Sequence, residues 1–108
     1  MIATLSLSAM MLLAPLQATT RPVTLAWDQP TGETWTEVRI YETVGTTDVL
    51  QATAKCSAPG TCPTTITFTT TKILHHFFAR SYNGDLESDN SNTATLPGPP
   101  KPPGNLRR

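Results

Sequence analysis

The chain has 108 residues, enough for one small domain, and carries 8 Lys and Arg against 8 Asp and Glu, so its formal charge is +0. Its basic residues form no cluster apart from Arg107 and Arg108. Because nucleic-acid binding depends on concentrated positive charge, the composition argues against a nucleic-acid partner.

The first segment, residues 1–18, is apolar or small in its side chains and precedes the polar pair Thr19-Thr20. This outline predicts a signal peptide cleaved after Ala18, and therefore export to the periplasm, the cell surface or the medium. Two alternatives stay open. The segment is retained as a membrane anchor, since about 17 apolar residues approach the length of a span, or it is retained and buried in a larger assembly. A membrane partner is expected only if the segment is retained.

From Arg21 to Leu96 the sequence consists of short runs rich in Val, Ile, Thr, Phe and Tyr, separated by Gly, Pro, Asn and Asp. No window long enough for a helix shows helical periodicity, so the pattern predicts an all-β domain. The expected strands cover residues 23–28, 37–42, 48–52, 64–71, 73–83 and 92–96.

Alternation with period two divides each expected strand into an inward and an outward face. The residues expected inside are Val23, Leu25, Trp27, Val38, Ile40, Ile66, Phe68, Ile73, His75, Phe77, Ala79, Ser81, Ala94 and Leu96. Strands with one apolar face each are accommodated most simply in a sandwich of two sheets. We therefore expect a β-sandwich over residues 19–96 and an extended Pro-rich tail over residues 97–108.

Two cysteines, Cys56 and Cys62, flank a segment that contains Pro59-Gly60, a strong turn signal. A turn brings the thiols within reach, and export places them in an oxidising compartment, so we expect a disulfide. Closing so short a loop contributes roughly 2–3 kcal/mol on the chain-entropy model. The alternative is two free thiols in a reducing compartment. A zinc site is not expected, because only two sulfurs are present and the histidines lack a matching spacing.

Three segments of the chain form a pattern: Val23-Thr24-Leu25-Ala26-Trp27-Asp28, then Val38-Arg39-Ile40-Tyr41, then Phe77 to Asn83 followed by Glu87-Ser88 and Ser91-Asn92. Together they resemble a fibronectin type III module of the kind found in exported bacterial and phage proteins. The resemblance covers about residues 22–96. It implies an immunoglobulin-like two-sheet sandwich that binds, spaces or displays rather than catalyses. The chain departs from the family pattern at His75, where a tyrosine is usual, and in leaving little room for a strand before Val23.

No set of residues predicts catalysis or metal binding. His75 and His76 are adjacent, which on a strand places them on opposite faces, so they do not hold one metal ion together. Acidic residues alternate over Asp85–Asp89, but the glycine and the distal glutamate of a calcium loop are missing, and a solvated acidic loop is expected instead. No Ser/His/Asp set and no opposed carboxylate pair is evident. We expect no enzyme, no metal and no cofactor.

Six aromatic and arginine residues are expected to lie on one face of a sheet and to form what we call the aromatic–arginine stripe: Trp35, Arg39, Tyr41, Phe78, Arg80 and Tyr82. These residue types dominate protein-binding hot spots. The alternative is that some of them fill the sandwich or pack under residues 1–18, because an apolar surface on a lone module is usually covered.

The first functional hypothesis is a non-catalytic structural or binding module that contacts other proteins, as a homo-oligomer or among assembly neighbours, on a cell surface or as a decoration or tail component of a phage virion. The second is a carbohydrate-binding or spacer module of a secreted protein, with Trp35 and Tyr41 stacking on sugar rings. The tail is either a plain linker or, like residues 1–18, a segment that pairs with an open sheet edge of a neighbouring copy.

Overall fold

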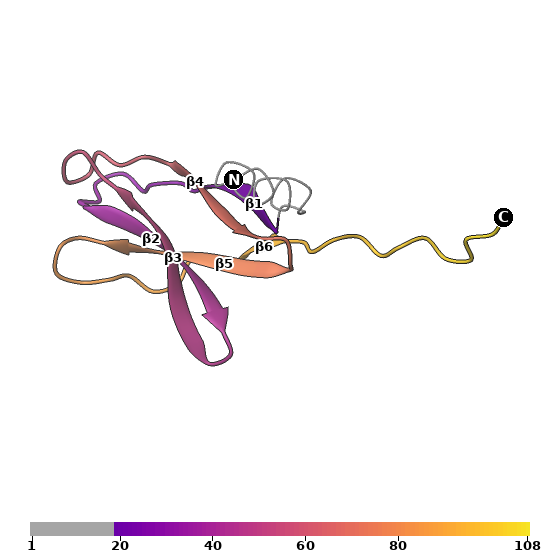
Figure 1. The fold of residues 1–108 in the computed structure, drawn as a ribbon. Helices are drawn as coiled ribbons and strands as arrows, with labels where there is room; N and C mark the ends of the chain where they lie inside the picture. The colour runs from indigo at the N-terminus through magenta and orange to yellow at the C-terminus, as the bar shows by residue number, and fades with distance from the viewer. Residues whose placement is uncertain (1–18) are drawn as a thin grey trace, which may run out of the picture.

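A computed structural model describes residues 19–108, and these contain six β-strands and no helix. The strands are β1 (Thr20–Ala26), β2 (Glu37–Val44), β3 (Thr47–Lys55), β4 (Thr65–Thr71), β5 (His75–Tyr82) and β6 (Ala94–Leu96). All pairs are antiparallel: β1 pairs with β4, and the other four strands follow the order β3-β2-β5-β6 (Figure 1). The all-β prediction is confirmed, and the two sheets are consistent with a β-sandwich.

The hypotheses of a signal peptide or a retained anchor fall on residues 1–18, which lie outside the described residues. From residue 19 onward, the structure has no helix that is long and apolar enough to cross a membrane.

The core follows the predicted alternation of side chains. Val38 and Ile40 on β2 and Phe77 on β5 are at most 2% exposed. Phe68 on β4 meets Phe77 edge to face, with ring centroids 5.3 Å apart, so the small sheet packs directly on the large one. Burying one such aromatic side chain contributes roughly 1.5–3 kcal/mol. Partly buried residues complete this core, among them Leu25, Trp27, Ile66, Ala79 and Leu96, all of which were expected inside.

Two strand predictions are corrected. Ile73, expected inside, is 61% exposed because it lies in the turn between β4 and β5 and not in the strand. The third strand, Thr47–Lys55, is longer than the expected 48–52 because its pairing with β2 continues to Lys55 opposite Glu37, and it contains a bulge. Ile40 pairs with Ala52 while Tyr41 pairs with Leu50, which leaves Gln51 as the extra residue on β3.

Pro22 lies within β1, which begins at Thr20 rather than at Val23. Directly after the strand, the Trp27 N–H donates to the carbonyl of Thr64 at 3.0 Å. Backbone groups alternate in direction along a strand, so the odd-numbered residues of β1 face β4 and the even-numbered residues face the free edge. Pro22 is even-numbered, and its missing N–H therefore costs no hydrogen bond in the ladder.

His75 lies in the core, and both of its ring nitrogens have hydrogen-bond partners. This agrees with the prediction that His75 and His76 point to opposite faces of their strand. His75 is 5% exposed, and its Nδ1 lies 2.5 Å from the Glu42 carboxylate. Its Nε2 lies 3.0–3.1 Å from the hydroxyls of Thr70 and Thr71. The ring also stacks on Phe77, with centroids 5.3 Å apart. His76 points outward and is exposed.

The predicted disulfide joins Cys56 and Cys62 and closes the loop that follows β3. Two backbone hydrogen bonds fasten this loop to the segment entering β2: Cys56 N–H to the Thr36 carbonyl and Gly60 N–H to the Trp35 carbonyl, both at 2.9 Å. The disulfide is compatible with an extracellular location, because such bonds persist in oxidising surroundings.

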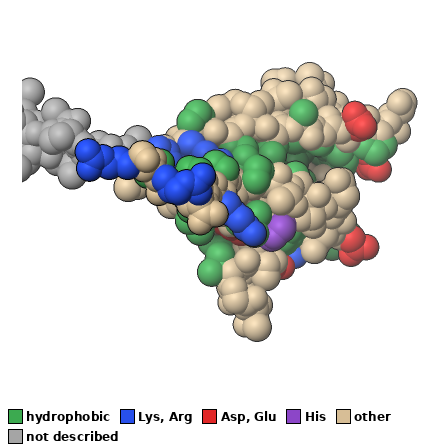
Figure 2. Space-filling model, turned by 90° about the vertical axis from the view of Figure 1, so that its right-hand side faces the viewer, with side chains coloured by type: hydrophobic (Ala, Val, Ile, Leu, Met, Phe, Trp, Pro, Cys, Tyr) green, Lys and Arg blue, Asp and Glu red, His purple; other side chains and the backbone are tan. Residues whose placement is uncertain are grey.

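The tail, residues 97–108, leaves β6 as an extended segment whose first residues are held against the sandwich. The Arg21 guanidinium donates to the carbonyls of Ile73 and Pro97. Gly98 packs so closely that a Cβ there would lie 3.1 Å from the Leu74 backbone nitrogen. Beyond this point the tail is exposed, and Figure 2, which faces this end of the molecule, shows Lys and Arg side chains gathered around it.

Candidate functional site

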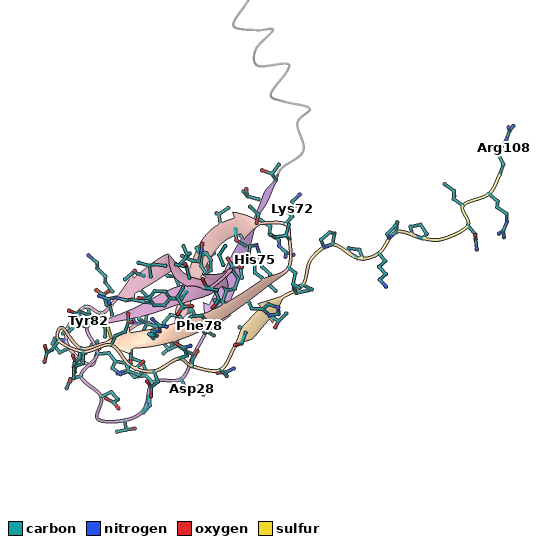
Figure 3. All side chains as sticks on the ribbon, turned by 90° about the horizontal axis from the view of Figure 1, so that it is seen from below. Asp28, Lys72, His75, Phe78, Tyr82 and Arg108 are labelled. Carbon is teal, nitrogen blue, oxygen red and sulfur yellow. A yellow bond between two sulfur atoms is a disulfide. The ribbon has the colours of Figure 1, made fainter. Side chains whose placement is uncertain are left out.

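The pairing of β2 with β5 places the outward residues of the two strands side by side. Arg39 lies opposite Arg80, and Tyr41 lies opposite Phe78. Tyr82 ends β5, and the labels of Figure 3 mark Phe78 and Tyr82 along that strand. The structure therefore brings together five of the six residues predicted for the aromatic–arginine stripe on the outer face of the four-stranded sheet.

Rings and guanidinium groups stack along this face. The Tyr41 and Phe78 rings are stacked, with centroids 5.8 Å apart and planes at 15°. The Arg39 guanidinium lies 3.9 Å from the Tyr82 centroid, and the Arg80 guanidinium lies 4.6 Å from the Tyr41 centroid. Such cation–π contacts hold the long arginine side chains flat against the sheet. Phe78 is only 8% exposed, so it is the base of the stripe and not its outer surface.

The loop after β5 closes onto the stripe through Glu87. One carboxylate oxygen of Glu87 accepts hydrogen bonds from the Tyr41 phenol at 2.5 Å and from Arg39 Nη1 at 3.0 Å. The other oxygen accepts from Arg80 Nη1 at 3.1 Å. Sequence reasoning predicted a solvated acidic loop here and missed this role. The one available signal was that Glu87-Ser88 belongs to a segment resembling the fibronectin type III pattern.

Three further acceptors complete the partners of the two arginines. Arg39 Nε donates to Glu37 at 2.6 Å. Arg80 donates from Nη2 to Asp48 and from Nε to Asn90, both at 2.7 Å. All three Arg80 nitrogens are thus engaged within the chain, whereas Arg39 Nη2 has no partner among residues 19–108.

The hydrogen bonds change the proton affinities on this face. The Tyr41 phenol above all, and then the two arginines, hold the pKa of Glu87 below its ordinary value of 4.5. Burial, reinforced by the neighbouring Glu87 carboxylate, raises the pKa of Tyr41. At neutral pH the stripe therefore has charged arginines, a charged Glu87 and a neutral phenol.

Trp35, the sixth predicted residue, does not lie on the stripe. It packs against the core cluster, while Tyr41 points outward, so the two rings do not form one stacking platform for a sugar. At the end of the sandwich where β5 ends, Trp35 lines a groove of about 390 Å³. The other residues that line this groove are Glu33, Ser81, Asn83, Leu86, Glu87 and Ser88.

Residues 19–108 contain no group of three or more His, Cys, Asp or Glu side chains arranged to hold a metal ion. No family model matches the chain, and neither a curated protein nor a solved structure matches it. The resemblance to fibronectin type III modules therefore depends on the sequence motifs alone.

Proposed function

We propose that the chain is a non-catalytic module of the fibronectin type III kind that makes protein–protein contacts on a cell surface or as a decoration or tail component of a phage virion. The contact surface is the outer face of β2 and β5, where the aromatic–arginine stripe lies. The disulfide supports an exported or extracellular setting, because disulfides persist in oxidising surroundings.

The observation that carries this proposal is the stack of Arg39 on Tyr82. Arginine and tyrosine are enriched among the residues that contribute most to protein interfaces. Hydrogen bonds to Glu37 and Glu87 already fix the Arg39 side chain, which remains 25% exposed. A partner that covers it loses little side-chain entropy on binding, and the free Arg39 Nη2 supplies a donor for a partner's carbonyl or carboxylate.

Site-specific photo-crosslinking tests the proposal in the native assembly. A photoreactive phenylalanine analogue replaces Tyr82 in one preparation and Thr67 in a control, since Thr67 is exposed on β4 in the other sheet. We expect irradiation to give a defined protein adduct from position 82 and none from position 67. Absence of an adduct from position 82, or identical adducts from both positions, would contradict the proposed surface.

A glycan titration separates this function from the carbohydrate-binding alternative. The protein-contact proposal expects no heat of binding with soluble glycans and loss of the protein adduct in an Arg39→Ala chain. Glycan binding that disappears in Trp35→Phe and persists in Arg39→Ala would instead assign the module to carbohydrate recognition.

A further inference from the structure

Many of the charged side chains of this neutral chain lie at two ends of the sandwich. The end from which the tail leaves has basic residues on the sandwich and along the tail: Arg21, Lys72, Lys101, Arg107 and Arg108. The end at which β5 stops has more acidic than basic residues in the segments around Tyr82: Glu33, Glu37, Asp85, Glu87 and Asp89, with the basic Lys55 opposite Glu37. Figure 3 shows Lys72 and Tyr82 at these two ends. The molecule therefore has a basic end and an acidic end.

The tail has the chemistry of a polyproline arm. Five of its residues are proline, and it has three basic residues and no acidic one. A polyproline II segment of this length extends about 37 Å without internal hydrogen bonds. Because proline has no N–H, the tail is a poor strand to add to a sheet edge. The contacts of Arg21 and Gly98 fix the start of the arm, and Figure 3 shows it running away from the sandwich to Arg108.

The groove at the acidic end has the features that bind such an arm. Proline-rich segments in the polyproline II conformation dock on grooves lined by aromatic side chains. Trp35 and the 69%-exposed Leu86 give the groove an apolar lining. Glu33 is exposed at its side, and within residues 19–108 its carboxylate accepts no hydrogen bond. Glu33 is therefore free to pair with a basic residue of an incoming arm.

We propose that the Pro-rich tail of one copy docks in the Glu33–Trp35 groove of a second copy, so that the copies associate head to tail. Docking within one chain is disfavoured because the stiff arm leaves from the end opposite the groove and points away from it. Each associated pair keeps one free tail and one free groove, so the contact is heterologous and extends into a ring or a filament. This contact does not use the Arg39–Tyr82 stack and stands independently of the function proposed above.

Sedimentation velocity on the full chain tests the proposal with two charge-reversed variants. The tail variant carries Lys101→Glu, Arg107→Glu and Arg108→Glu, and the groove variant carries Glu33→Lys. We expect the unaltered chain to self-associate at about 50 mM NaCl and to dissociate at about 500 mM, because exposed charges are screened by salt. Each variant should associate roughly tenfold more weakly. Lys55→Glu reverses an exposed charge at the same end of the sandwich as the groove but outside the residues that line it, and should associate no more weakly than the unaltered chain.

A mixture of the two variants gives the sharpest result. The basic tail of the groove variant matches the unaltered groove of the tail variant, and the acidic tail of the tail variant matches the reversed charge in the groove variant, so the mixture should associate more tightly than either variant alone. A monomeric unaltered chain at low salt would overturn the proposal. So would a tail variant that associates like the unaltered chain, or a mixture that associates no more tightly than either variant alone.

Discussion

Tyr41 and Glu87, separated by 46 residues in the chain, are joined by a hydrogen bond of 2.5 Å from the phenol to the carboxylate. This bond connects the middle of β2 to the loop that follows β5. The same carboxylate also binds Arg39 and Arg80, so a single side chain holds three members of the aromatic–arginine stripe in place.

The first prediction is that Glu87→Gln destabilises the fold. The amide keeps the size of the side chain but loses the charge that Arg39 and Arg80 neutralise, so we expect the free energy of unfolding to fall by about 1–2 kcal/mol in a urea titration. Glu33→Gln is the matched control, and it should stay within about 0.5 kcal/mol of the unaltered chain. Equal effects from the two substitutions would show that the Glu87 network adds nothing to stability.

The second prediction concerns acid. The pKa of Glu87 is lower in the folded chain than its ordinary value of 4.5, mainly because the Tyr41 phenol donates to it. As the pH falls, the unfolded chain takes up this proton first, so the stabilisation is complete above the unfolded pKa and is lost as the pH falls through the folded pKa. The difference in unfolding free energy between the unaltered chain and Glu87→Gln should be constant down to about pH 5.5 and shrink below about pH 4.5. A difference that grows as the pH falls would mean that folding raises the pKa of Glu87 and does not lower it.

The third prediction separates the two histidines. His75→Ala removes the partner of the largely buried Glu42 carboxylate and opens a space beside Phe77, so we expect a loss of about 2–4 kcal/mol in unfolding free energy. His76→Ala removes an exposed side chain and should change stability by less than about 0.5 kcal/mol. Thermal and urea unfolding of both variants measure the contrast. A His75→Ala chain as stable as His76→Ala would mean that the His75–Glu42 pair is not formed in solution.

The fourth prediction concerns the disulfide between Cys56 and Cys62. Replacing both cysteines by alanine should lower the free energy of unfolding by roughly 2–3 kcal/mol, because the open loop gains freedom in the unfolded chain. Adding reductant to the unaltered chain should have nearly the same effect, whereas the double variant should not respond to reductant. A reductant effect that persists in the double variant would have a cause other than this bond.

The alternation of apolar and polar residues along the sequence predicts which side chains of a strand are buried. Alternation correctly assigns Val38, Ile40 and Phe77 to the core, because each strand has one buried face. Alternation alone does not show where a strand begins, so Ile73 is assigned inward although it lies in a turn. The alternation also does not show that the loop after β5 folds back onto the outer face of the sheet, so the contacts of Glu87 with the stripe were not predicted. Trp35 has the residue type of a binding site, but its position just before β2 directs it toward the core.

Pro22 has a further consequence for the free edge of β1. Long, regular sheet edges are templates on which crowded chains convert to cross-β aggregates. On the free edge of β1, Pro22 removes a donor from the middle of the row. On β3, an edge strand of the four-stranded sheet, the extra residue Gln51 breaks the regular register. These two edges are therefore poorer templates for amyloid-type stacking than regular strand edges of the same length.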